Sequence, residues 1–154
     1  MEGVKTGYTR ASMYGFVGAA KRGGIELFSV VLGANTLSAR FSETRKLLDW
    51  GYLHCHLKPV VYQSTVFRVA PAGTPTGRVV IAQPKQTAYA PLLDGGAWPT
   101  RKTSLSAVNF PLKAGTQVGV VYELLGSIVV AKVPLIATKD VPATPLTRAA
   151  TAAQ

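Results

Sequence analysis

The chain has 154 residues, of which 47% are apolar and 16% charged, with 15 glycines, 10 prolines and one cysteine. This composition is globular, and it excludes disordered, collagen-like and disulfide-stapled chains. No apolar run reaches the roughly 18 residues of a membrane-spanning helix, because Lys132 and Pro134 interrupt the best candidate at 127–137. The first residues carry no basic segment followed by an apolar run, so no signal peptide is predicted.

The net charge is +10, from 17 Lys and Arg against 7 Asp and Glu. Residues 1–51 contribute +3 and residues 52–154 contribute +7. A field of this sign attracts carboxylates, phosphates and anionic polymers. The basic residues are spread as single residues and pairs rather than as dense stripes, so we do not expect nucleic acid to be a partner.

The first 51 residues predict strands followed by one helix. A short strand is expected at 3–8, and residues 14–21 and 25–32 are small, apolar or β-branched. The intervening Arg22-Gly23-Gly24 supplies residues that accept positive φ, which is typical of a hairpin turn.

An amphipathic helix is predicted after the hairpin. Ser38 is expected to be its N-cap, and residues 41–48 present apolar side chains at helical spacing. Gly51 is expected to end it.

From Tyr52 onward the sequence predicts strands and turns without a helix. Regular spacing of β-rich segments indicates a small antiparallel domain, sandwich-like or barrel-like. The expected strands are 60–70, 78–83, 103–110, 116–124 and 127–137.

The predicted fold class is therefore α+β, in four parts. Residues 1–51 form the hairpin-plus-helix part, 52–57 a linker, and 58–137 a small all-β domain. Residues 138–154 contain eleven Ala, Thr or Pro and no aromatic residue, so they are expected to be a disordered tail.

Lys5-Thr6-Gly7 on the first strand is a motif with a chemical rationale. A cation, a hydroxyl and a position without a Cβ suit a strand that binds a carboxylate while ligand backbone comes close. Taken alone, the motif is also compatible with an ordinary exposed strand. Arg40, at the head of the predicted helix, is by itself equally compatible with a solvated arginine.

Four segments carry a family resemblance: VKTGYTR (4–10), YGFVGAAKRGGIELFSVVLGA (14–34), ARFSETRKLLDWGY (39–52) and FPLKAGTQVGVVYELLGSIVVAKVPLIATKDVP (110–142). In this order and spacing they resemble the low-molecular-mass, serine-type D-alanyl-D-alanine carboxypeptidases, which are penicillin-binding proteins. The resemblance implies that residues 1–51 are the C-terminal portion of a transpeptidase-like catalytic domain of the penicillin-binding/β-lactamase type. It implies that the β-rich part is the domain that follows.

The resemblance implies a role for five residues. Lys5 and Tyr8 would be catalytic, with the Tyr8 backbone N–H as half of the oxyanion hole. Thr6, Gly7 and Arg40 would be substrate-binding, and Lys5, Thr6 and Arg40 together would hold the terminal carboxylate of a peptidoglycan stem peptide ending in D-Ala-D-Ala.

The family's other two motifs, S-x-x-K and S-x-N, are absent. Ser12, Ser38 and Ser42 have Gly15, Phe41 and Arg45 where the lysine would stand. The chain is therefore expected to be the C-terminal segment of such an enzyme, without the N-terminal catalytic half. By itself it is expected to be inactive and unreactive toward β-lactams, which the full-length enzyme would bind. The parent is expected in the periplasm or on the outer face of the membrane, without a cofactor.

His54-Cys55-His56 raises the possibility of a metal site, since alternate residues of a strand share a face. Two neighbouring ligands do not close a site, and no carboxylate lies near in sequence, so an inter-domain linker is expected instead.

A second class of function stays open: a non-enzymatic basic β-domain that binds anionic cell-wall polymer or a partner protein. Self-association is also possible, because Val4, Phe16, Val17 and Phe28 are expected to lie open on the sheet. Core or domain-junction packing, rather than a stacking platform for a ligand, is expected of Trp50, Trp98 and Phe110.

Overall fold

The computed structural model describes residues 2–74 and 78–143. The chain divides into two compact units. Unit 1 comprises residues 1–57 and 91–96, and unit 2 comprises residues 58–90 and 97–154. The division falls inside two strands, and so the chain leaves unit 1, returns to it once and leaves again.

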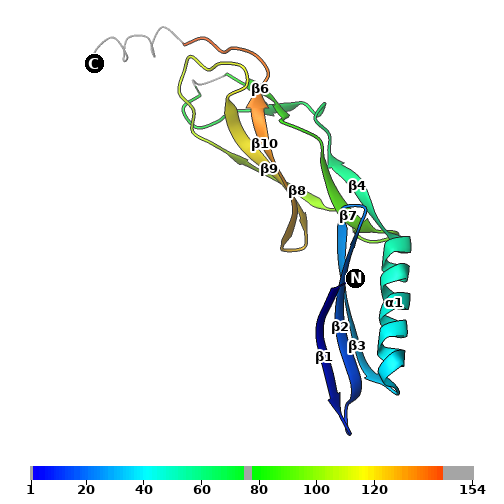
Figure 1. Ribbon diagram of the computed structural model, residues 1–154. Helices are drawn as coiled ribbons and strands as arrows, with labels where there is room; N and C mark the ends of the chain where they lie inside the picture. Colours follow the sequence, from blue (N-terminus) through cyan, green and yellow to red (C-terminus); the bar gives the residue numbers. More distant parts are fainter. Residues whose placement is uncertain (1, 75–77, 144–154) are drawn as a thin grey trace. The chain divides into compact units, whose positions relative to one another are not determined.

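Unit 1 is a three-stranded antiparallel sheet with one helix on it (Figure 1). The strands are β1 (Glu2–Thr9), β2 (Met13–Arg22) and β3 (Ile25–Ala34), in that order across the sheet. Helix α1 (Leu37–His54) packs against β2 and β3. The β2–β3 hairpin is confirmed, and the two glycines at its turn have φ of +58° and +83°, as a tight reversal of this kind requires.

The face of the sheet under α1 holds the core of unit 1. Phe16 is 4% exposed, and its ring meets that of Phe41 edge-on with the centroids 4.9 Å apart. Thr44 and Leu48 of the helix are also buried. The expectation that Phe16 lies open is therefore wrong, because alternation along β2 turns it toward the helix.

The other face of the sheet is apolar and exposed. Phe28, Val30 and Leu32 alternate along β3 and are 68%, 59% and 80% exposed. Val4 on β1 is exposed as well. Self-association through this face stays a prediction.

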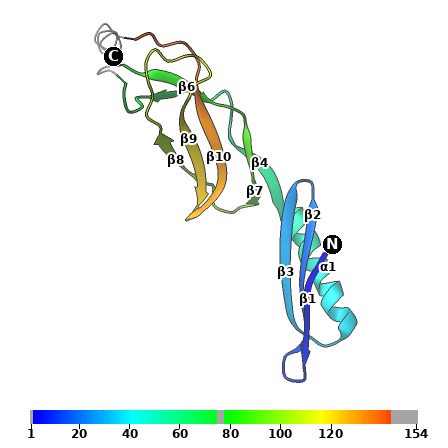
Figure 2. The same ribbon diagram turned by 60° about the vertical axis from the view of Figure 1, so that its left-hand side comes forward.

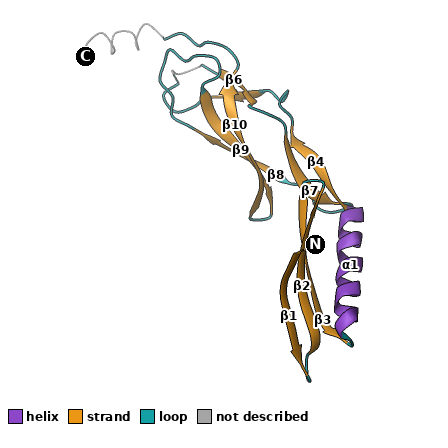
Figure 3. Cartoon of the chain, viewed as in Figure 1, coloured by secondary structure: helices purple, strands orange, loops and turns teal. Residues whose placement is uncertain are grey.

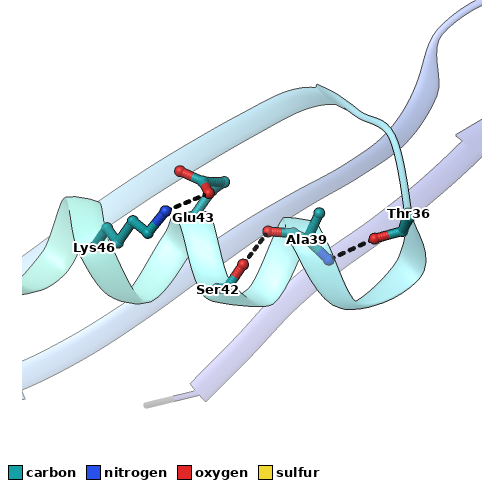
Figure 4. A network of polar contacts seen from close by, with 5 residues as sticks. All are labelled: Thr36, Ala39, Ser42, Glu43 and Lys46. Carbon is teal, nitrogen blue, oxygen red and sulfur yellow. Dashed lines mark hydrogen bonds and ion pairs between the residues drawn. The ribbon is translucent and has the colours of Figure 1, made fainter.

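Thr36, not Ser38, is the N-cap of α1 (Figure 4). Its backbone is extended, and its hydroxyl accepts a hydrogen bond from the Ala39 N–H at 3.0 Å. Within the first turns Ser42 donates to the Ala39 carbonyl at 3.0 Å, and Lys46 pairs with Glu43 at 2.8 Å. Thr36 satisfies a backbone donor that the first turn of any helix leaves free.

The helix also runs past Gly51 and ends at His54. A Cβ at Gly51 would lie 2.7 Å from the Leu27 side chain. Gly51 is therefore a packing glycine that lets β3 approach the helix, and not the helix terminator that the sequence predicts.

Unit 2 is built on a five-stranded antiparallel sheet, and a separate two-stranded ladder joins β4 and β7 (Figure 3). The α+β class and its small β-rich second part are confirmed. The ladder strands are β4 (Cys55–Val61) and β7 (Ala88–Leu93), and the sheet order is β5 (Phe67–Val69), β6 (Val80–Pro84), β10 (Ile128–Ala137), β9 (Gln117–Leu125), β8 (Thr100–Leu105).

The core of unit 2 comes from alternate residues of these strands. Small and β-branched side chains dominate it, in keeping with strands buried on one face. The side chains with no exposed surface include Val61, Ala82, Val118, Val121 and Leu135.

Several strand boundaries differ from the sequence expectation. The run 60–70 is interrupted, since β4 ends at Val61 and β5 begins at Phe67. The strand expected at 103–110 starts at Thr100 and stops at Leu105. β7 lies where the sequence predicts no strand, and it contains Pro91. The expected linker, 52–57, is the end of α1 and the start of β4.

Residues 138–143 are held to unit 2, in contrast to the disordered tail expected from 138. Val141 and Leu112 exchange two backbone hydrogen bonds of 2.8 and 2.7 Å. The Arg78 guanidinium donates to the Pro142 carbonyl at 2.8 Å. Backbone pairing therefore orders a segment too poor in apolar residues to be recognised from composition. The rest of the expected tail, 144–154, lies outside the described residues.

Candidate functional site

The Lys5-Thr6-Gly7 motif lies in the middle of β1, an edge strand of the unit 1 sheet. β1 pairs with β2 on one side, and no described strand pairs with its other side. All residues of the motif, and Tyr8 after it, are exposed. The strand thus presents side chains and one backbone edge to a ligand.

The register divides the motif between the two faces of the sheet. Thr6 stands opposite Phe16, and Tyr8 opposite Tyr14. Directly opposed residues share a face, so Thr6 and Tyr8 lie on the α1 face and Lys5 lies on the other.

Gly7 leaves open space above the strand. A Cβ built at this position would have no heavy atom within 4 Å. Its partner on β2 is Gly15, so two glycines face each other across the ladder. This is the one place in the motif where a ligand backbone could lie directly on the strand.

Arg40 is buried in the first turns of α1, with 9% of its surface exposed. Its guanidinium carbon lies 4.8 Å from the Phe41 ring centroid and 5.7 Å from that of Tyr14. Its Nε has no hydrogen-bond partner within residues 2–74 and 78–143. A buried guanidinium with an unmet donor is unlike the solvated arginine that remained possible from the sequence.

A chain of ring contacts links Arg40 to the motif strand. Below the guanidinium, the ring of Tyr14 meets that of Tyr8 with the centroids 4.5 Å apart and the planes tilted by 37°. No hydrogen bond or ion pair in the described part of the chain joins Arg40 directly to Lys5 or Thr6. The helix start and β1 are therefore connected through Tyr14.

The two imidazoles around Cys55 have different partners. His54 stacks on Trp50 with ring centroids 4.9 Å apart, and His56 Nε2 lies 3.2 Å from Asp94 Oδ2. Among the described residues no group of three or more His, Cys, Asp or Glu side chains lies close enough to hold a metal ion.

An apolar groove of about 420 Å³ lies beside α1 in unit 1 and is not evident from the sequence. Its walls include Leu27, Phe28, Trp50 and Leu93. Trp50 is 55% exposed and Trp98 is 61% exposed, so neither is a core residue, and packing at a domain junction stays a prediction for both. The groove could not be predicted from the sequence, because one of its walls, Leu93, comes from a segment far away along the chain.

Comparison with known proteins gives matches to one enzyme family. In sequence, the chain is 48% identical over 52 residues to the D-alanyl-D-alanine carboxypeptidase DacC of Escherichia coli K12, and the match spans 34% of this chain but only 13% of DacC. It is 35% identical over 60 residues to DacF of Bacillus subtilis 168, across 39% of this chain and 15% of DacF. No family model matches.

Solved structures match over nearly the whole chain. DacD of Francisella tularensis aligns with a TM-score of 0.56 and 24% identity, across 92% of this chain and 36% of that one. PBP3 of Streptococcus pneumoniae, described as a peptidoglycan synthesis regulatory factor, aligns with a TM-score of 0.61 and 25% identity, across 90% and 42%. The resemblance expected from the sequence is confirmed, and the chain spans well under half of each relative.

Proposed function

We propose that this chain, whose sequence and fold match the C-terminal part of the low-molecular-mass penicillin-binding proteins, supplies the carboxylate-binding strand of a D-alanyl-D-alanine carboxypeptidase. The substrate would be a peptidoglycan stem peptide ending in D-Ala-D-Ala. The observation that carries the proposal is Arg40: it is buried, its Nε lacks a partner in the described residues, and it contacts Tyr14, which leads to the motif strand.

Each residue has a task that its chemistry suits. The Thr6 hydroxyl would donate to the terminal carboxylate on the α1 face, with Arg40 as a cation. Lys5 starts on the opposite face, so its long side chain would have to reach the same carboxylate around the open edge of β1. The open space at Gly7 would admit the substrate backbone. The Tyr8 backbone N–H would be one of two donors to the oxyanion that forms at the scissile carbonyl.

The covalent step would use a serine outside this chain, within an S-x-x-K motif of the complete enzyme. That serine would attack the carbonyl between the two D-Ala residues, and the terminal D-Ala would leave. Water would then hydrolyse the acyl-enzyme. The nucleophile would come from the S-x-x-K motif outside this chain. The residues of this chain would orient the peptide and stabilise the negative charge that develops on the carbonyl oxygen.

The test uses the complete enzyme and two substrates. Thr6→Val and Arg40→Gln should slow acylation by a D-Ala-D-Ala peptide by about tenfold or more, the loss expected for one charge-assisted hydrogen bond. Acylation by an ester without a carboxylate should change little. Thr9→Val is the control, because the Thr9 hydroxyl is bonded to Ser12. Equal losses on both substrates would assign these residues a structural role and overturn the proposal.

Reaction with a penicillin distinguishes the role of this chain from that of the part of the complete enzyme that would hold the S-x-x-K serine. The 154-residue chain incubated with a fluorescent penicillin and then denatured should retain no label, whereas the complete enzyme should. A stoichiometric adduct on a serine of this chain would contradict the proposal.

The complete enzyme would act where peptidoglycan lies, in the periplasm or on the outer face of the membrane. Within the described residues no helix is long and apolar enough to cross a membrane. Fractionation of cells that make the complete enzyme tests this location, and recovery in the cytoplasm alone would contradict it.

A further inference from the structure

Three side chains form a row across the unit 2 sheet. In the register of β8, β9 and β10, Lys102 stands opposite Tyr122, and Tyr122 opposite Lys132. These strands lie side by side in Figure 2. The Lys132 Nζ is 5.7 Å from the Tyr122 ring centroid, within the range of a cation–π contact.

The row lies on the outer face of the sheet. The neighbouring positions Val121, Val133 and Glu123 are 0%, 1% and 2% exposed and face the core. Because side chains alternate between faces, the row faces away from that core. Lys102 and Lys132 are exposed and Tyr122 is half-buried, in agreement with this placement.

The charges of unit 2 are unbalanced. Its described residues include nine Lys and Arg but only two carboxylates, Glu123 and Asp140. Those two are paired with Arg101 and Lys113. No described carboxylate therefore neutralises the row, and the excess positive charge attracts an anionic ligand.

A shallow groove of about 300 Å³ lies along the row. Lys102, Ser104, Tyr122, Leu124 and Val129 line it. The Ser104 hydroxyl has no partner within the described part of the chain, whereas that of Thr100 donates to the Leu124 carbonyl at 3.4 Å. The groove thus combines an aromatic and aliphatic floor with one cation, Lys102, and a free hydroxyl, and Lys132 adds a second cation next to the Tyr122 ring outside the lining.

From these observations we infer that unit 2 binds an acidic polysaccharide across β8, β9 and β10. The apolar face of a sugar ring would pack on Tyr122, its hydroxyls would bond to Ser104, and its acidic groups would pair with Lys102 and Lys132. The two lysines are separated by two strand spacings, roughly 10 Å, which adjoining sugar rings can span.

The single ring argues against single-stranded nucleic acid, which stacks successive bases on several aromatic side chains. A sheet face with one small groove also offers little apolar surface to insert into a lipid layer. The inference concerns unit 2 alone and does not depend on the function proposed for the strand in unit 1.

Binding of the whole chain to polygalacturonate, a carboxylate-bearing polysaccharide, is the direct test. Lys102→Gln/Lys132→Gln should weaken binding by about tenfold or more, because two charge-assisted contacts are lost. Lys21→Gln/Lys139→Gln removes the same charge from exposed sites outside the row and should weaken it about twofold or less. Equal losses in the two double variants would show non-specific attraction and overturn the inference.

Further probes separate the polysaccharide from other ligands. Neutral dextran should not bind, and Tyr122→Leu and Ser104→Ala should each weaken polygalacturonate binding several-fold with an unchanged circular dichroism spectrum. Ser104 is exposed, so its variant remains informative if Tyr122→Leu does not fold. Tighter, Lys102-dependent binding to oligo-dT or to phosphatidylglycerol vesicles would identify another ligand and overturn the inference, as would binding that neither Ser104→Ala nor the lysine variant changes.

Discussion

Arg101 Nε lies 2.5 Å from Glu123 Oε1, and the two residues stand directly opposite each other on β8 and β9. The Glu123 side chain is only 3% exposed, while that of Arg101 is 40% exposed. The same guanidinium donates to the Val60 carbonyl at 3.0 Å. One arginine thus neutralises a buried carboxylate and joins β4 to the sheet within unit 2.

Arg101→Ala should lower the free energy of unfolding of unit 2 by about 2–4 kcal/mol, because a buried carboxylate is left unpaired. The measurement is urea denaturation in a Trp50→Phe background, where fluorescence reports Trp98 of unit 2 alone. Lys102→Ala, one position along the same strand and exposed, is the matched control and should change stability by less than about 0.5 kcal/mol. Similar effects of the two substitutions would rule out the buried pair as the cause.

Asp140→Asn should change how stability depends on pH. The Ala114 backbone N–H at 2.8 Å and the Lys113 ammonium at 2.9 Å hold the pKa of Asp140 below its ordinary value of 3.8. Since the folded-state pKa is the lower one, the ionised carboxylate stabilises the fold above pH 3.8, and this contribution is lost as the pH falls through the folded-state value. The free energy of unfolding, measured by denaturation from pH 2 to pH 6, should differ between parent and variant near pH 6, and the two values should converge as the pH falls.

Lys113→Gln provides the comparison for Asp140. The Ala114 N–H is the larger cause of the lowered pKa and survives this substitution, so part of the pH dependence should remain. Parent and Asp140→Asn curves that run parallel down to pH 2 would show that Asp140 titrates alike in the folded and unfolded chain.

Thr36→Ala should destabilise unit 1 by about 1 kcal/mol, the usual cost of losing an N-cap side chain. Ser38→Ala, which removes the residue that the sequence favours as the cap, should cost only a few tenths of a kcal/mol. Trp50 fluorescence in a Trp98→Phe background monitors unit 1. A larger loss for Ser38→Ala would reassign the cap.

Gly18→Ala and Gly7→Ala should separate packing from binding. A Cβ at Gly18 would lie 2.9 Å from Phe16 Cε1 and 3.0 Å from Thr44 Cγ2, so overpacking should cost about 1–3 kcal/mol. A Cβ at Gly7 meets nothing, and stability should stay within about 0.5 kcal/mol.

In the complete enzyme, Gly7→Ala should nevertheless slow acylation by a D-Ala-D-Ala peptide, because the added methyl group occupies the space where the substrate backbone would lie. A Gly7→Ala enzyme with parental acylation rates would remove Gly7 from the proposed site.

Local sequence patterns predicted the elements whose signals are themselves local. The Gly23-Gly24 turn with β-rich flanks indicated the hairpin, and apolar spacing around Leu47 indicated the helix. The patterns failed where a distant residue decides: Gly51 resembles a terminator until Leu27 is packed against it. By composition Val141 belongs to the expected disordered tail, but its backbone pairs with that of Leu112.

In the candidate site, too, features set by neighbouring residues could be predicted and features set by distant residues could not. The motif strand at Lys5 could be recognised from short-range order, and the family resemblance pointed to Arg40. The burial of Arg40 against Tyr14 could not be predicted, because it depends on how β2 and α1 pack. The row through Tyr122 was equally hidden, since Lys102 and Lys132 become neighbours only through the register of three strands.

The return of residues 91–96 to unit 1 affects how this architecture can be recombined. Asp94 donates its N–H to the His54 carbonyl at 2.8 Å, and its carboxylate meets His56, so this segment belongs structurally with the end of α1. A single crossover after Leu57 would transfer a β domain but leave the first unit without these partners. Exchange of the β domain between proteins of this architecture therefore requires matched junctions in both β4 and β7. A gene fusion made with the β4 junction alone should yield an incomplete unit 1.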